Sequence, residues 1–367
     1  MNRRQFLAGM LALAAMPGRT FAAWPFSRHR SAENAKTLAL AAAKPGLLYG
    51  SPLFPGDFQK SDYLKLFDTQ VSIVTNTIYM SATQPTPATW NLSGFENVRA
   101  FAKKHKLKMR GHPLVWHQAL PDWVGAISSP PEARRVIHDR IVKLVGQYKG
   151  EFQSWDVVNE AVSSRHSSGD HLTPCVWSRQ LGVEYLDYAF HVAHKTDRHA
   201  LLTYNDFGTE DDSDSNQAKR ELVFDLLKGM IKRKAPVQAV GLQSHLNGGA
   251  AFKTLPDWIN RLKSLKLHVF ITELDVNDKS FPSDKIERDT LVAKTYGDFL
   301  GSALSSRRVD ITLTWGLADP YSWLQTVKWA ERADGQPERP LPFGDRMEPT
   351  AVFYSMRSAF LDAPHRA

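Results

Sequence analysis

The sequence reads WDVVNE at residues 155–160 and ITELDV at residues 271–276, two short apolar strings that each run into a glutamate. Apolar, β-branched runs of this length predict buried strands. A charged residue belongs where a strand leaves its sheet, because inside the sheet it would lose its hydration. Glu160 and Glu273 are therefore predicted at the carboxyl ends of two strands. Such a pair can carry out acid–base chemistry, or its members can be structural carboxylates that bind loop amides or an arginine.

Short apolar runs alternate with longer amphipathic stretches from about residue 45 to the C-terminus. Predicted strands cover residues 47–50, 71–75, 108–111, 152–158, 200–204, 239–243, 268–272 and 310–315. Apolar residues three and four positions apart predict helices at residues 94–105, 131–148, 183–196, 216–233, 255–265 and 286–305. Eight strand–helix units, with no Gly-rich phosphate loop after the first strand, favour an α/β fold of the closed (β/α)8 TIM-barrel type over an open doubly wound sheet.

The composition bounds the domain organisation. A chain of 367 residues, 43% hydrophobic and 23% charged, can bury a large core and shows no bias towards disorder or fibres. No linker, repeat or low-complexity tract marks a second domain, so we predict a single monomeric barrel domain over residues 46–367. Residues 24–45 are expected to form a loosely packed N-terminal lead-in. The single cysteine, Cys175, excludes an internal disulfide.

The N-terminus predicts export. Residues 3 and 4 are both arginine, residues 6–16 form an apolar run, and small residues at 22 and 23 offer a cleavage site. These features predict a twin-arginine signal peptide over residues 1–23, too short to span a bilayer. We therefore expect a periplasmic or secreted protein whose mature form has no membrane span. The net charge is +8, and no basic run is interleaved with aromatics, so a nucleic-acid partner is not expected.

The predicted strand ends carry polar and aromatic side chains. The third strand ends in GHPLVWH at residues 111–117, the fifth in YND at 204–206, the sixth in QSH at 243–245 and the eighth in WGLAD at 315–319. A single His or Trp is usually part of a core. Packing alone does not explain why such residues occur at the same end of six strands. In a (β/α)8 barrel the carboxyl ends of the strands carry the active site.

Two carboxyl groups at this end suit the cleavage of a glycosidic bond. A retaining mechanism needs carboxyls about 5 to 5.5 Å apart: one attacks the anomeric carbon, and the other protonates the leaving oxygen and later deprotonates a water. Neighbouring strand ends can supply that proximity. A metal mechanism has no support, because the chain has one cysteine and no His-x-x-x-His pair with a glutamate between. No cofactor is expected.

These motifs resemble those of glycoside hydrolase family 10, the β-xylanase family of retaining barrel enzymes, over about residues 47–361. The resemblance is carried by RGH at 110–112, VWH at 115–117, WDVVNE at 155–160, QSH at 243–245, TELD at 272–275, WG at 315–316, Asp319 and SW at 322–323. It implies that Glu160 is the general acid/base and Glu273 the nucleophile.

The resemblance also implies a substrate-binding set. Asn159 resembles the residue that binds the sugar 2-hydroxyl, His245 resembles a partner of the nucleophile, and Asp275 would support that histidine. Two tryptophans offer flat faces on which a pyranose can stack. The implied binding residues are Asn76, His112, Trp116, Asn159, Asn205, Gln243, His245, Trp315 and Trp323.

One region departs from the family pattern. After the second strand the family usually reads Glu-Asn-x-x-Lys-Trp, whereas this chain has TNTIYM at residues 75–80, and Gln118-Ala119 stands where Ser-Gln is common. Thr75, Tyr79 and Ala119 cannot reproduce the hydrogen bonds that normally hold the second glycone xylose. Each buried partner lost typically costs about 1–3 kcal/mol, enough to change the preferred sugar.

Four functions follow from these observations. The motifs favour a retaining endo-1,4-β-xylanase that hydrolyses internal bonds of xylan. The departures favour another retaining β-glycanase or transglycosylase, acting on a β-linked polysaccharide such as a bacterial exopolysaccharide. A binding protein that has lost its chemistry is disfavoured because both carboxylates remain. Aldol or phosphate chemistry is disfavoured because no lysine ends a strand and no Gly-rich loop follows strands seven or eight.

Overall fold

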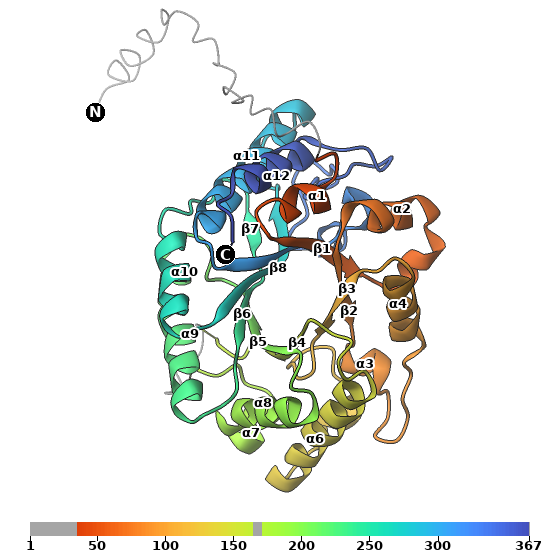
Figure 1. Ribbon diagram of the computed structural model, residues 1–367, viewed down its shortest axis with the longest axis vertical. Helices are drawn as coiled ribbons and strands as arrows, with labels where there is room; N and C mark the ends of the chain where they lie inside the picture. Colours follow the sequence, from red (N-terminus) through yellow and green to blue (C-terminus); the bar gives the residue numbers. More distant parts are fainter. Residues whose placement is uncertain (1–34, 164–170, 367) are drawn as a thin grey trace, which may run out of the picture. The chain divides into compact units, whose positions relative to one another are not determined.

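Eight parallel strands close into a barrel (Figure 1). The computed structural model describes residues 35–163 and 171–366, so the predicted signal peptide at residues 1–23 lies outside the described residues. The barrel strands are β1 (Leu48–Leu53), β2 (Ile73–Thr77), β3 (Lys108–His112), β4 (Ser154–Asn159), β5 (Leu201–Asp206), β6 (Ala239–Leu242), β8 (His268–Asn277) and β9 (Val309–Thr314). Strand β9 pairs with β1, and β6 pairs with β8, which closes the ring and confirms the predicted TIM barrel.

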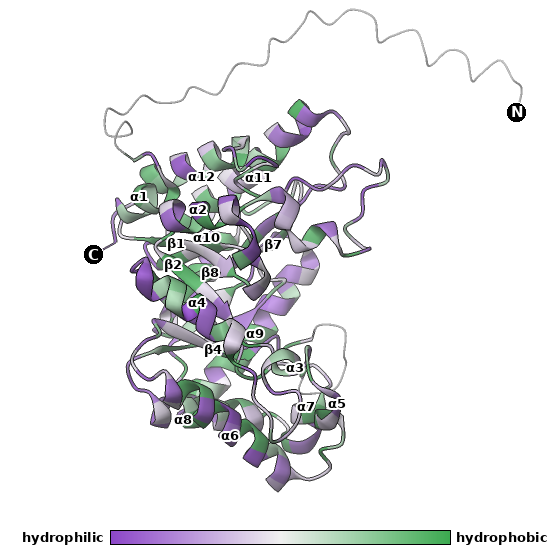
Figure 2. Cartoon of the chain, turned by 90° about the vertical axis from the view of Figure 1, so that its right-hand side faces the viewer, coloured by the Kyte–Doolittle hydropathy of each residue, from purple (hydrophilic) through white to green (hydrophobic). Residues whose placement is uncertain are grey.

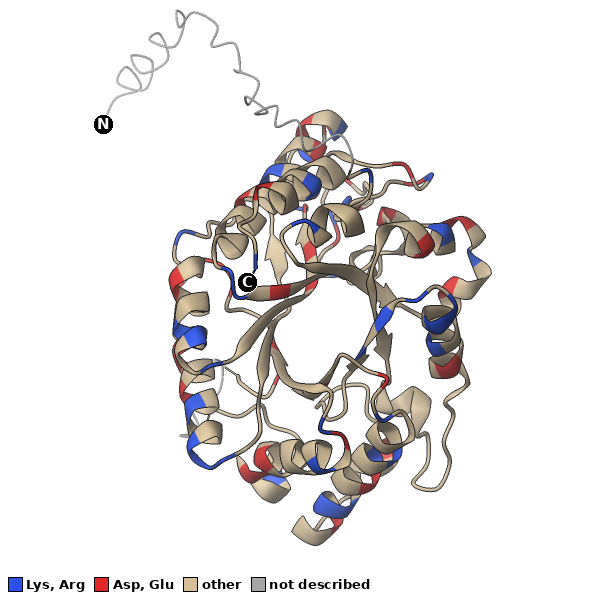
Figure 3. Ribbon diagram, in the orientation of Figure 1, with Lys and Arg blue, Asp and Glu red and all other residues tan. Residues whose placement is uncertain are grey.

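Helices surround the barrel (Figure 1). The longer ones are α2 (Ser61–Gln70), α4 (Ser93–Lys104), α6 (Pro130–Gln147), α8 (Glu184–Thr196), α9 (Asp214–Lys232), α10 (Leu255–Ser264), α11 (Lys285–Ser305) and α12 (Ala351–Asp362). Hydrophobic and hydrophilic residues alternate along them (Figure 2), as expected for helices that bury one face. Charged residues gather on these helices and are sparse on the barrel strands (Figure 3).

Shorter elements occupy the connections between strands and helices. They are α1 (Leu38–Ala43), α3 (Met80–Thr83), α5 (Asp122–Gly125), α7 (Val176–Leu181) and the 3-10 turns η2 (Pro55–Gln59), η3 (Asp319–Tyr321) and η4 (Trp323–Gln325). No helix within residues 35–163 and 171–366 is both long and apolar enough to cross a membrane.

The described part of the predicted lead-in differs from the loose segment expected there. Thr37 accepts a hydrogen bond from the backbone N–H of Leu40 and caps α1. Leu38, Ala41 and Ala42 are fully buried, and α1 packs against α12. Apolar residues spaced three and four apart give this short helix a face that joins the core. Residues 35–366 therefore form one compact unit, and the domain begins earlier than residue 46.

The sixth strand position is broken in two. Strand β6 ends at Leu242, and β7 (His245–Asn247) pairs with the last residues of β8 instead. At the break, Ser244 has a φ of +65°, and its N–H donates to Glu210 Oε1 at 3.0 Å. The pairing of β8 with β9 is also irregular between Ile271 and Leu274. The seventh predicted run, residues 268–272, therefore extends further as β8, and Glu273 lies at an irregularity within this strand rather than after its end.

The barrel interior changes from apolar to polar towards the carboxyl ends of the strands. A separate cluster of buried apolar side chains comes from the strands themselves: Ile73, Ala239, Phe270, Ile311 and Leu313. The Arg110 guanidinium lies 5.7 Å from the ring centre of Phe270 and pairs with the fully buried Asp156. A buried charge is stable only beside a partner of opposite charge, and Arg110 and Asp156 provide this for each other. This ion pair lies next to His112 of the predicted site.

Gly111 in β3 is a position where any side chain would disturb the barrel. A Cβ there would lie 2.0 Å from Trp155 Cε3 on β4. We expect Gly111→Ala to lower the free energy of unfolding by about 1–3 kcal/mol through overpacking, measured by urea denaturation. Gly301→Ala in α11 is the matched control, because nothing lies within 4 Å of its added Cβ. Equal midpoints for Gly111→Ala and the wild type would contradict the close packing of these strands.

Candidate active site

Glu160 and Glu273 lie at the carboxyl end of the barrel, and both are buried. Glu160 directly follows β4 and has a φ of +55°, an uncommon value for a side chain of this kind. Its backbone N–H donates to the Asn205 carbonyl at 2.8 Å, which holds this conformation. The side chains of Glu160 and Glu273 are embedded among other polar groups, with relative exposures of 8% and 4%. Both predicted carboxyls are thus fixed by neighbouring strands.

Three donors surround the Glu160 carboxyl group. Oε1 accepts from Asn159 Nδ2 at 3.0 Å and from Gln243 Nε2 at 2.9 Å. Oε2 accepts from the indole N–H of Trp116 at 2.9 Å. Burial raises the pKa of Glu160 above its ordinary value, although the bonds from Gln243 and Trp116 oppose that rise and the nearby Glu273 adds to it. The environment therefore favours the protonated acid.

The Glu273 carboxyl group has a cationic environment. Oε1 accepts from Asn205 Nδ2 at 2.7 Å and lies 3.9 Å from His112 Nδ1, while Oε2 lies 3.3 Å from His245 Nε2. Burial alone would raise the pKa of Glu273, but His112, His245 and the Asn205 bond outweigh burial and hold it below its ordinary value. The surroundings thus favour an ionised Glu273 beside a protonated Glu160.

Asn205 at the end of β5 connects the two carboxyl groups. Its Nδ2 donates to both Glu273 Oε1 and Asn159 Oδ1, the latter at 2.9 Å, and Asn159 donates onward to Glu160. Its own Oδ1 accepts from the Thr272 hydroxyl at 2.7 Å, which fixes the orientation of the amide. A Cβ at Gly241 would lie 2.0 Å from Asn205 Oδ1, so only glycine leaves room for this side chain.

A chain of hydrogen bonds supports His245 from behind. Its Nδ1 lies 2.9 Å from Asp275 Oδ1, and the indole N–H of Trp323 donates to Asp275 Oδ2 at 2.6 Å. Burial alone would lower the pKa of His245, but the carboxylates of Asp275 and Glu273 raise it well above its ordinary value. These contacts favour a cationic imidazole beside Glu273, and the supporting role of Asp275 stays a prediction.

A second support lies beneath His112. Its Nδ1 is 2.8 Å from Asp156 Oδ2, and Asp156 also binds Arg110. Arg110 Nε donates to the Ser154 hydroxyl at 3.1 Å. All of these side chains are buried, so the imidazole orientation is set by a network that the solvent does not reach.

Aromatic rings border the carboxyl pair. The ring centre of Trp315 lies 5.4 Å from that of His112, and the ring centre of Trp116 lies 5.8 Å from that of Tyr79, with 36° between the planes. Burial raises the pKa of Tyr79, and Glu273 and Glu160 raise it further, so its hydroxyl stays neutral. Tyr79, noted in the sequence only as a departure, is therefore part of the site.

The other departures are buried or held by their backbone. Thr75 is fully buried in β2, and its hydroxyl has no hydrogen-bond partner within the described part of the chain. Ala119 has a φ of +49°, and its carbonyl accepts from the N–H of Ser81. Asn76, predicted to bind substrate, donates to the Phe95 carbonyl at 2.9 Å and has no bond to either glutamate. Its role in binding stays a prediction.

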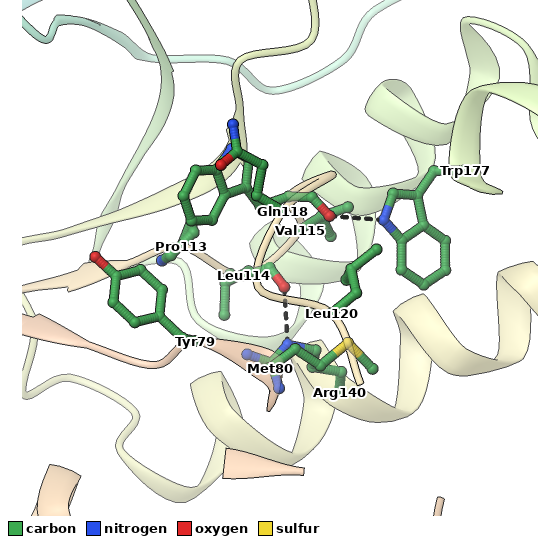
Figure 4. Close-up of a pocket in the computed structure, with 10 residues that line it drawn as sticks. Tyr79, Met80, Pro113, Leu114, Val115, Gln118, Leu120, Arg140 and Trp177 are labelled. Atoms are coloured by element: carbon green, nitrogen blue, oxygen red, sulfur yellow. Dashed lines mark hydrogen bonds between the residues drawn. The ribbon is translucent and has the colours of Figure 1, made fainter. Parts of the chain in front are cut away.

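Arg140 on α6 is a residue that sequence reasoning missed. Its guanidinium donates to the Leu114 carbonyl at 2.9 Å, to the Thr83 hydroxyl at 3.3 Å and to the Ile78 carbonyl. Figure 4 shows it beneath Leu114 in a pocket that Tyr79 also lines. Burial lowers the pKa of Arg140 to about 9. The sequence could have indicated this role, because Arg140 stands among the apolar residues on the buried face of α6. Its bonds anchor the loop segments next to Tyr79 and Trp116.

A second group missed from the sequence follows β5. Asp206 accepts from the buried Lys219 Nζ at 2.7 Å and from the Tyr204 hydroxyl. Lys219 Nζ also lies 3.8 Å from the ring centre of Phe207, which is 46% exposed. The Asp206 charge contributes to the raised pKa of Glu160, after the larger effect of burial. An exposed aromatic ring thus stands beside the Glu160 side of the site.

No group of three or more His, Cys, Asp or Glu side chains that could hold a metal ion occurs among residues 35–163 and 171–366. The site therefore consists of two carboxyls whose pKa values are shifted in opposite directions, surrounded by amides, imidazoles and flat aromatic rings. This combination at the carboxyl end of a (β/α)8 barrel defines a glycoside hydrolase.

The comparisons with known proteins specify the family. The chain belongs to glycosyl hydrolase family 10, whose family model matches residues 37–359. It is 32% identical to a β-1,4-xylanase of Dictyoglomus thermophilum, over 74% of this chain and 76% of that protein. It is 30% identical to endo-1,4-β-xylanase B of Paenibacillus barcinonensis, over 76% of this chain and 85% of that protein. The structure of native xylanase 10B from Thermotoga maritima matches with a TM-score of 0.80 at 26% identity, over 88% of this chain and 98% of that one.

The His245 environment gives a prediction that needs no substrate. We expect Asp275→Asn to lower the pKa of His245, because it removes the carboxylate that contributes most to raising that pKa. An NMR titration of the imidazole signals measures this change. Asp310→Asn is the matched control, since it removes the partner of the exposed His268 at the start of β8. An unchanged His245 titration in Asp275→Asn would contradict the proposed support.

Proposed function

We propose that this protein is a retaining endo-1,4-β-xylanase that hydrolyses internal β-1,4 bonds of xylan by double displacement. The observation that carries the proposal is the opposite electrostatic bias of two linked carboxyl groups, Glu160 towards the acid and Glu273 towards the carboxylate. The xylanase names of relatives that align over three quarters of this chain support the choice of substrate.

In the first proposed step, Glu273 attacks the anomeric carbon while the leaving oxygen takes the proton of Glu160. The glycosidic C–O bond breaks, a glycosyl ester forms on Glu273, and Glu160 becomes a carboxylate. In the second step Glu160 accepts a proton from water, the water oxygen attacks the anomeric carbon, and Glu273 leaves. The products are two shorter sugar chains, and both carboxyls return to their starting states.

The surrounding groups have roles that follow from their contacts. Asn159 donates to Glu160 and would bind the sugar 2-hydroxyl, a bond that strengthens as positive charge develops on the ring. The cationic His245 holds Glu273 ionised before attack. His112, Gln243 and Trp315 would border the sugar at the point of cleavage, where the tryptophan face packs against pyranose C–H groups.

A second function is favoured by the neighbourhood of Tyr79. The ring of Tyr79 packs against Trp116 and His112, and the hydroxyl of Thr75 is buried, so neither matches the donors that the family places at the second glycone sugar. We therefore propose, as the alternative, a retaining β-glycanase or transglycosylase whose preferred polymer is a decorated xylan or a bacterial exopolysaccharide. We also propose that the enzyme works in the periplasm or outside the cell, where such polymers occur, after twin-arginine export.

The two carboxyls should respond differently to removal of their charge. We expect Glu273→Gln to lower kcat at least roughly a thousandfold on every substrate, because no nucleophile remains. Glu160→Gln should lower kcat on polysaccharide by about 10²–10⁴-fold but spare the first step for an aryl xylobioside with a good leaving group. On polysaccharide, kcat/KM of the wild type should fall at high pH because the Glu160 acid ionises as pH rises through its raised pKa, and Glu160→Gln should lack that fall. With the aryl substrate the first step needs no proton, so it should show no such fall in either protein. Stopped-flow release of the aryl group measures this step.

Similar losses for both variants on the aryl substrate would contradict the assigned roles. Asn277, at the end of β8, provides a matched control, and Asn277→Asp should leave the difference between the two substrates unchanged. Circular dichroism and melting temperature confirm that each variant is folded.

The substrate is tested with a panel of polymers. We expect the protein lacking residues 1–23 to release xylobiose and xylotriose from linear xylan, measured by chromatography beside glucuronoxylan, arabinoxylan, β-glucan and an acidic bacterial exopolysaccharide. Tyr79→Lys restores a cationic donor of the family type, so it should raise kcat/KM on linear xylan if the Tyr79 ring weakens xylose binding there. Cleavage of another polymer with none of the three xylans cut would replace the xylanase by the alternative.

A further inference from the structure

Trp329 is the one exposed tryptophan in the part of the chain that the structure describes, with 52% of its surface accessible. It follows η4 in the connection between β9 and α12. Its ring centre lies 5.6 Å from that of Trp323, at 65° between the planes. Trp323 in turn lies 5.0 Å from His245, ring centre to ring centre, so the exposed ring continues the aromatic border of the active site.

The segment that carries Trp329 is fixed on both sides of the ring. Lys279 Nζ donates to the Trp329 carbonyl, and the next residue, Ala330, is fully buried. Arg332 is itself buried and donates to Asp278 Oδ1 at 2.8 Å, directly after the end of β8. The exposure of the indole is therefore set by bonds to the barrel and is not the result of a loose loop.

Single exposed aromatic side chains are common on protein surfaces, and Trp329 is distinguished from the others by its contact with Trp323 at the border of the active site. Here the exposed ring borders a site for a polymeric sugar, and a pyranose packs its C–H groups on a flat ring while its hydroxyls stay hydrated. Two exposed lysines adjoin the ring. Lys328 precedes Trp329 in the sequence, and Lys279 Nζ lies 5.9 Å from the ring centre. They keep the surroundings of the ring hydrophilic, which suits a hydrated sugar better than an apolar partner.

We propose that Trp329 forms an additional subsite, which stacks a sugar unit of the polysaccharide beyond the one bordered by Trp323. This inference rests on the proposed xylanase function and adds to it a residue that senses chain length. A short oligosaccharide that fills only the subsites next to the cleaved bond does not reach this ring, whereas a polymer does.

The test compares the activity on linear xylan with the activity on xylotriose, in the protein lacking residues 1–23. Trp329→Ala should lower the ratio of kcat/KM on xylan to kcat/KM on xylotriose by about 3- to 10-fold, the effect expected for one lost aromatic contact. Most of the change should be in KM. Trp329→Phe keeps a flat ring and should restore most of the ratio. Migration of the same variants in native gels that contain xylan measures binding independently of turnover.

Tyr354→Ala is the matched control, because it removes an equally exposed aromatic side chain from the outer helix α12. This control should leave the ratio and the gel migration unchanged. If Trp329→Ala has the same ratio of kcat/KM on xylan to kcat/KM on xylotriose as the wild type, the subsite proposal is overturned and the proposed function is unaffected. Equal losses on both substrates, with a lower melting temperature, also overturn it by showing that the ring is structural. A wild-type enzyme that does not cleave xylan overturns the proposed function and the subsite together.

Discussion

The arrangement of the active site depends on Asn205 at the end of β5. Its carbonyl accepts the backbone N–H of Glu160, and its side-chain amide donates to Glu273 and to Asn159. Both carboxyl groups are therefore positioned from one strand end, and the positive φ of Glu160 is tolerated because its N–H is satisfied there. The requirement for glycine at position 241 follows from the same amide, which occupies the space of a side chain.

Rigid positioning explains how the pKa values of two buried carboxyls in one site shift in opposite directions. Glu160 is surrounded by neutral donors, so its burial dominates, whereas Glu273 faces two imidazoles that are oriented by Asp156 and Asp275. Each imidazole has its own carboxylate behind it, and these carboxylates are buried within the barrel. The charge of Glu273 is thus compensated by a layer of ion pairs inside the barrel and not by solvent.

The sequence predicted the barrel well because its strands are marked by apolar runs and its helices by regular spacing. It placed Glu160 correctly after its strand, whereas Glu273, predicted at a strand end, lies within β8 because that strand continues to Asn277. It did not predict the break between β6 and β7, because the positive φ of Ser244 depends on the bond that its N–H donates to the distant Glu210. Arg140 and the packing of α1 were missed for a similar reason: their partners are backbone carbonyls or helices far away in the sequence. Local patterns carry no information about such partners.

The altered residues of the site lie beside kept ones. The departures from the family follow β2 and β3, where the ring of Tyr79 packs against Trp116 and His112, whereas most of the other bonds around the glutamates come from β4, β5, β6 and β8. Arg140 holds these segments through the backbone carbonyls of Leu114 and Ile78, and every amino acid has such a carbonyl whatever its side chain. The side chains of these segments can therefore change without loosening the loops that carry them.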